Sequence, residues 1–179
     1  MRKANAILTA VILILFVVHG ILGSLSLVGA GQTTMKVLAW ITLGLVAVHV
    51  VLGTILTSKS VKVWHKTGAP YFKQNHLFWA RRISGLAVMI LLAFHMTAFG
   101  YTSQGAYRLS YFGTFRLITQ ILLIIAIAFH VITNVKPMLI SFGIKKLKPK
   151  ASDILFVLSI LFVFFVAAFI IYFIRWNAA

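Results

Sequence analysis

The stretch FWARRISGLAVMILLAFH, residues 78–95, governs how the rest of the chain is interpreted. Arg81 and Arg82 precede an apolar run that ends in His95. The thirteen helical steps from Arg82 to His95 cover roughly 20 Å. The hydrocarbon core of a bilayer is about 30 Å thick, so His95 is expected past its midplane, counted from the arginines. An ionisable side chain at that depth is costly and indicates function.

The composition of the 179 residues indicates a membrane protein, because 61% of them are hydrophobic. There are 17 lysines and arginines, a single acid (Asp153) and no cysteine. The basic residues lie between apolar runs, where orientation signals belong, so nucleic acid is excluded as the partner. The lack of cysteine excludes disulfides, thiolate-held metals, iron–sulfur clusters held by this chain and covalently attached haem.

The pattern predicts an all-α fold, an integral membrane bundle of five transmembrane helices in one domain, residues 1–179. Each apolar segment is close to the ~20 residues that span a bilayer, and only helices satisfy the backbone of single segments there. The predicted helices cover about 5–28, 35–57, 79–100, 114–136 and 152–174. Long connections at 58–78 and 137–151 are rich in lysine.

The basic residues predict the orientation in the membrane. With the N-terminus in the cytoplasm, only Lys36, Arg108, Arg116 and Arg175 fall outside, and the other lysines and arginines fall inside. Such a positive-inside bias predicts a bacterial cytoplasmic membrane protein with its N-terminus inside and its C-terminus outside. The lipid bilayer is therefore the first expected partner.

Each of the first four predicted helices contributes one histidine. From the spacing to the nearest basic boundary residues, His19 and His95 are expected in the outer half (the outer pair). His49 and His130 are expected nearer the inner boundary (the inner pair), on the order of 10 Å away along the membrane normal.

A haem b group can take two imidazoles at one level as its axial ligands, so two such pairs predict two haem b groups. Zinc would need further ligands that are absent, and proton relays normally use carboxylates, which the first four helices lack. The remaining alternative is that the histidines only bond neighbouring helices. For the haem propionates, the expected cations are Arg81, Arg82, Lys59 and His76 at the inner level and Lys36, Arg108 and Arg116 at the outer level.

Residues 78–96, FWARRISGLAVMILLAFHM, and 124–138, IIAIAFHVITNVKPM, resemble two haem-bearing helices of the succinate dehydrogenase/fumarate reductase cytochrome b subunit. Five helices, four histidines and no cysteine are similar to the di-haem branch of that family. The resemblance implies the pairs His19–His95 and His49–His130. It also implies a quinone, menaquinone or another, near Arg82 and Ser84, and flavoprotein and iron–sulfur partners on the cytoplasmic side.

The sequence thus predicts four helices enclosing two stacked haems. The expected function is electron transfer between a quinone pool and a soluble redox partner, as the anchor subunit of a succinate dehydrogenase/fumarate reductase-like complex. Catalysis would belong to the partner, and this chain would have no catalytic residue of its own. The alternatives are a structural or assembly membrane protein, and a transmembrane reductase that delivers electrons outward.

Overall fold

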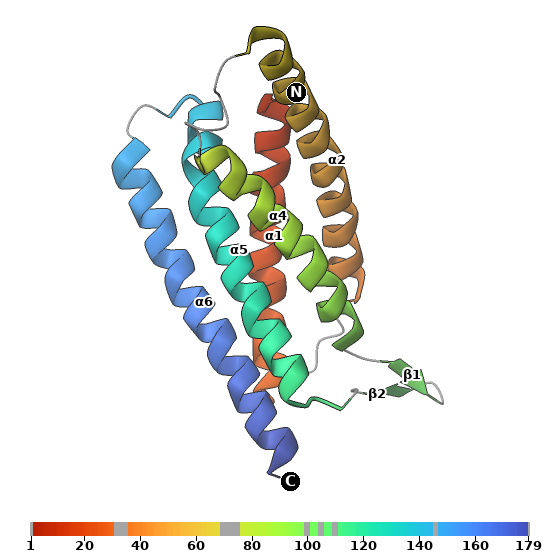
Figure 1. The fold of residues 1–179 in the computed structure, drawn as a ribbon. Coiled ribbons are helices and arrows are strands. Elements are labelled where there is room, and N and C mark those ends of the chain that lie inside the picture. Colours follow the sequence, from red (N-terminus) through yellow and green to blue (C-terminus); the bar gives the residue numbers. More distant parts are fainter. Residues whose placement is uncertain are drawn as a thin grey trace.

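The computed structural model describes residues 2–30, 36–68, 76–98, 101–103, 106–108, 111–144 and 147–178. Five long helices run alternately up and down, with the two chain ends at opposite ends of the bundle (Figure 1). They are α1 (Arg2–Leu27), α2 (Lys36–Thr67), α4 (His76–Ala98), α5 (Thr114–Ser141) and α6 (Leu147–Asn177). All five are long and apolar enough to cross a membrane, which confirms the predicted helical membrane protein.

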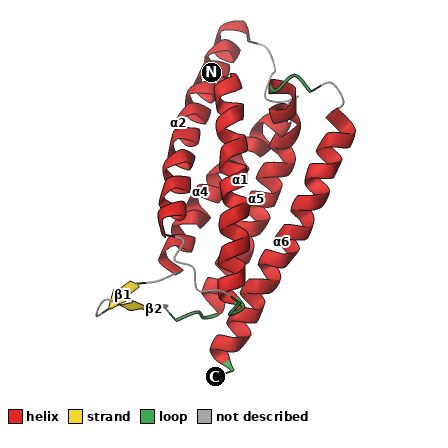
Figure 2. Cartoon of the chain, turned by 180° about the vertical axis from the view of Figure 1, so that it is seen from behind, coloured by secondary structure: helices red, strands yellow, loops and turns green. Residues whose placement is uncertain are grey.

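A short hairpin lies between α4 and α5 and was not predicted from the sequence. Strands β1 (Tyr101–Ser103) and β2 (Ala106–Arg108) pair antiparallel, with Tyr101 opposite Arg108. The hairpin projects at the end of the bundle where the C-terminus lies (Figure 2). The opposite end carries the N-terminus and the start of α6, and we call it the lysine-rich end.

Three helices extend five residues or more beyond the bounds that the sequence predicted. α2 continues ten residues beyond residue 57, so that Lys59, Lys62 and Trp64 lie on a helix and not in a loop. It ends at Gly68, whose φ of +61° is a left-handed conformation that favours glycine. α5 continues through Pro137 to Ser141, and α6 begins five residues early, at Leu147. Hydropathy marks where a helix leaves the membrane, whereas glycine and backbone geometry mark where it stops.

The helices pack as two pairs joined on one side. α4 packs along α5, and α2 packs on α1 without comparable contact to α4 or α5. α6 lies against α1 and α5, outside the four helices that carry histidine. The densest apolar cluster is on this α6 side, where Phe112 stacks on Phe169 and meets Tyr172.

Candidate functional site

The outer pair is formed by helices that are far apart in the sequence. His19 of α1 and His95 of α4 have ring centres 6.1 Å apart and planes at 78°. The Nδ1 atom of His95 donates to the side-chain oxygen of Gln120 on α5, 2.7 Å away. Gln120 has no exposed surface. The outer pair thus lies between α1 and α4, with α5 as a support.

The inner pair has the same construction on the other two helices. His49 of α2 and His130 of α5 have ring centres 6.4 Å apart and planes at 83°. His130 Nδ1 lies 3.0 Å from the hydroxyl of Ser84 on α4, and His49 Nδ1 lies 3.1 Å from Asn5 Oδ1 on α1. The pairs that the sequence depth predicts are the ones whose rings lie together.

The hydrogen bonds assign the same tautomer to three of these rings. Amide oxygens only accept, so the Nδ1 atoms facing Asn5 and Gln120 carry the proton. The Ser84 hydroxyl donates to the carbonyl of Arg81 at 3.2 Å, which leaves its oxygen to accept from His130. A neutral imidazole protonated at Nδ1 has its lone pair on Nε2. Each of these three rings therefore presents Nε2 as a potential metal ligand.

The ring spacing matches two imidazoles that share one metal. A histidine nitrogen lies about 2 Å from the metal it binds, and the ring centre lies about 1.1 Å further away. Two imidazoles on opposite sides of one ion would thus have centres about 6.2 Å apart. The observed 6.1 and 6.4 Å fall on either side of this value.

His19 differs from the other three histidines. Its Nδ1 atom is buried and has no hydrogen-bond partner within the part of the chain that the structure describes. A buried polar atom left without a partner costs about 1–3 kcal/mol. A ring that also served as a metal ligand would recover such a cost through the bond that it makes to the metal.

The two pairs occupy separate levels along the bundle. On α5, Gln120 marks the outer level and His130 the inner level, and the ten residues between them span about 15 Å. A cavity of about 220 Å³ lies against the inner pair, between α1, α2 and α5. Its polar lining includes Asn5, Thr9 and Asn134.

The two arginines of α4 reach the helices that carry the inner pair. Arg81 Nε donates to the carbonyl of Thr133 on α5 at 2.9 Å, and Arg82 Nε donates to the hydroxyl of Thr57 on α2 at 3.0 Å. The Arg82 guanidinium also lies 4.0 Å from the centre of the Phe78 ring. Both arginines therefore lie at the edge of the inner level, where the sequence placed them as propionate partners.

Arg116 lies at the outer level and is engaged with the backbone. Its Nη1 atom donates to the carbonyl of Tyr111 and, at 3.5 Å, to that of Ala98. These bonds tie the end of α4 to the start of α5. The predicted propionate partners Lys36 and Arg108 have side chains outside the described residues, and His76 is exposed at the start of α4.

The glycines near the histidines serve different purposes. A Cβ atom on Gly85 would lie 3.2 Å from Cε1 of His130, so this glycine admits the inner ring. Gly20 instead faces Phe165 of α6, where a Cβ would lie 2.5 Å from the ring. Gly23, Gly44 and Gly53 face open space. Gly85 therefore leaves room for the His130 ring, whereas Gly20 leaves room for the packing of α6 on α1.

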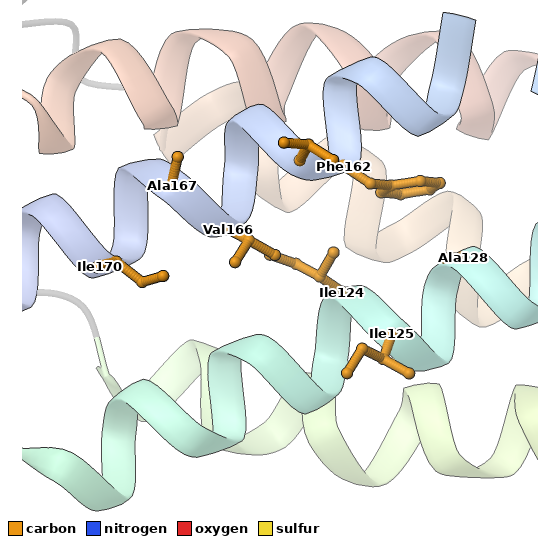
Figure 3. A pocket seen from close by; sticks show the side chains of 8 residues that line it. Ile124, Ile125, Ala128, Phe162, Val166, Ala167 and Ile170 are labelled. Atoms are coloured by element: carbon orange, nitrogen blue, oxygen red, sulfur yellow. The ribbon is translucent and has the colours of Figure 1, made fainter. Parts of the chain in front are cut away.

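A second cavity, of about 430 Å³, lies between α5 and α6 (Figure 3). Its lining is apolar and comes from both helices: Ile124, Ile125, Ala128, Phe162, Val163, Val166, Ala167 and Ile170. It offers no side chain that could bind a metal or carry a proton. The chemistry of the described residues is therefore concentrated at the two histidine pairs.

Sequence reasoning missed the side chains that hold the imidazoles, namely Asn5, Thr9 and Gln120. Thr9 lies 3.4 Å from His49 Nδ1 and donates its own proton to the carbonyl of Asn5. A signal was present, because Asn5 and Gln120 are amide side chains within apolar helices, and such residues usually bond a neighbouring helix. Which helix they face is decided by packing.

Within the described ranges, no group of three or more histidine, cysteine or acidic side chains is placed to hold a metal ion. The histidines of the helices lie instead as two pairs. No protein-family model, curated protein or solved structure matches the chain. The class of protein that fold and site define is an integral membrane protein with five apolar helices and two half-buried histidine pairs.

Proposed function

We propose that the protein is a membrane di-haem b cytochrome that passes electrons between a quinone pool and a soluble redox partner. The observation that carries this proposal is the doubled pair: four helices, two levels, and ring centres 6.1 and 6.4 Å apart. Both distances suit two axial imidazoles on one iron. The matching tautomers of three of the rings add independent support.

The residues at each level would hold a different haem. His19 and His95 would hold the outer haem, and His49 and His130 the inner one. Arg81 and Arg82 would pair with the inner propionates, and Arg116 would do so at the outer level. Haem iron with two axial histidines supplies one-electron transfer and leaves no position open for an added ligand. Ser84 would support the His130 ring, and a quinone, menaquinone or another, would bind near Arg82 and Ser84, as the resemblance implies.

The soluble partner is proposed to bind the lysine-rich end. Lys59, Lys62 and Lys66 are exposed on the last turns of α2, beyond the apolar part of that helix. Together with the resemblance to the succinate dehydrogenase/fumarate reductase cytochrome b subunit, this favours the role of an anchor for flavoprotein and iron–sulfur subunits. Electrons would pass along the two levels, and catalysis would belong to the partner.

The proposal is tested by the spectrum and haem content of the protein purified after haem-replete expression. We expect a dithionite-reduced b-type spectrum and two haems per chain. His19→Ala and His95→Ala should each leave one haem with the same spectrum, and His49→Ala and His130→Ala should each leave the other one. A colourless protein, or a residual spectrum that differs between two members of a pair, would refute the assignment.

A structural role for the histidines is the second candidate, and one observation favours it. Three of the four Nδ1 atoms bond a neighbouring helix, which is how a buried polar residue is satisfied. Ring centres about 6 Å apart also occur in ordinary aromatic contacts. This candidate predicts a colourless protein in which each alanine variant lowers stability.

A further inference from the structure

Gln120 is a fully buried amide in the second turn of α5, directly before the apolar run that begins at Ile121. Burying an amide without hydrogen bonds costs roughly 2–7 kcal/mol, so its presence on α5 needs a physical explanation. The Gln120 oxygen accepts from His95 Nδ1 at 2.7 Å, which is shorter than the corresponding contacts of His130 (3.0 Å) and His49 (3.1 Å). The position of this side chain therefore points to a role at the outer pair.

Three consecutive hydrogen bonds fix which end of the amide faces His95. The Thr119 hydroxyl donates to the carbonyl of Arg116 at 2.9 Å, so its oxygen is left to accept. The Gln120 amide nitrogen donates to that oxygen at 3.4 Å. The Gln120 oxygen consequently points at His95 and accepts its Nδ1 proton. A reversed amide would donate to Nδ1 and move the ring proton to Nε2, where it would block a metal bond.

We propose that Gln120 is the positioning residue of the outer site, which holds His95 in the metal-binding tautomer and lowers the reduction potential there. The inference rests on the proposed function. An acceptor on the second ring nitrogen makes the imidazole a stronger donor to the metal. The stronger donor stabilises ferric more than ferrous iron, and this lowers the potential.

The test is a redox titration of the full-length purified protein and its Gln120 variants, followed by visible absorbance. Gln120→Leu removes the acceptor, and loss of such a partner typically weakens metal binding 10–100-fold. A tenfold loss confined to the ferric state corresponds to an upward shift of about 60 mV. Gln120→Asn is too short to reach and should shift the potential in the same direction. Gln120→Glu supplies a carboxylate, which is a stronger acceptor than an amide oxygen, and should lower the potential below that of the wild type.

Ser84→Ala is the matched control, because Ser84 has the equivalent position beside His130 of the inner pair. It should move only the inner component of the titration, whereas Gln120→Leu should move only the outer one. The single-haem histidine variants identify which component is which. If Gln120→Leu should fail to fold, the opposite signs expected for Gln120→Asn and Gln120→Glu still decide the question.

Two different results would refute the proposed function and the role of Gln120 separately. A wild-type protein without haem would refute the proposed function itself. A protein with two haems, in which the Gln120 variants leave the outer potential unchanged or move both components equally, would overturn the positioning role alone. A purely structural role for Gln120 would reduce stability in all variants without the opposite signs.

Discussion

The bond between Arg81 and Thr133 explains how a proline is tolerated inside α5. Pro137 has no N–H, so it cannot donate to the carbonyl of Thr133 four residues earlier. Arg81 Nε donates to this same carbonyl at 2.9 Å. Arg81 therefore has a structural partner in addition to any propionate, and the two roles can be separated by experiment.

We expect Arg81→Met to lower the free energy of unfolding by about 1–3 kcal/mol, the cost of leaving a buried acceptor unpaired. In the Pro137→Ala background, the new alanine N–H can donate to the Thr133 carbonyl. The loss of unfolding free energy on Arg81→Met should therefore be smaller there by at least about 1 kcal/mol. Reversible unfolding in mixed detergent micelles, followed by circular dichroism, measures all four proteins of this double-mutant cycle. The haem content of the same four proteins reports on the propionate role independently.

Equal costs of Arg81→Met with and without the proline would refute this reasoning, because the arginine would then not be compensating for the missing N–H. A loss of inner haem that persists in the Pro137→Ala background would identify the propionate as the second partner of Arg81. If haem content recovered together with stability, the arginine would act on the inner level through α5 only.

Two further predictions concern the inner level and α2. Gly85→Ala should displace the His130 ring and reduce the inner haem component, because the new Cβ would lie 3.2 Å from Cε1 of that ring. Gly44 faces open space, so Gly44→Ala should leave both haem components intact. The dithionite-reduced spectrum measures both components. Because α2 packs on α1 and otherwise meets the bundle through the inner pair and the bond from Arg82 to Thr57, haem removal should increase hydrogen exchange in α2 more than in α5. Equal increases in both helices would contradict this account of how α2 is held.

Much of the histidine arrangement can be predicted from the amino-acid sequence alone. Hydropathy alone defines five membrane-spanning segments, since the bilayer fixes their length and requires them to be helical. Once the segments alternate in direction, the distance of each histidine from a basic boundary residue sets its depth. That is why the sequence could pair His19 with His95 and His49 with His130, whose rings the structure places together.

Lateral neighbours were decided only by the tertiary structure. Depth does not say which helix faces which, so the partners Asn5, Ser84 and Gln120 emerged from packing. The hydrogen bond from Arg81 to the Thr133 carbonyl was likewise decided by packing. An arginine at a membrane boundary has the same sequence pattern whether it binds a lipid, a propionate or a carbonyl. The sequence by itself thus determined the heights of the chemical groups, since the bilayer imposes one axis. The contacts across that axis depend on how the side chains of five helices fit together, and only the folded bundle fixes them.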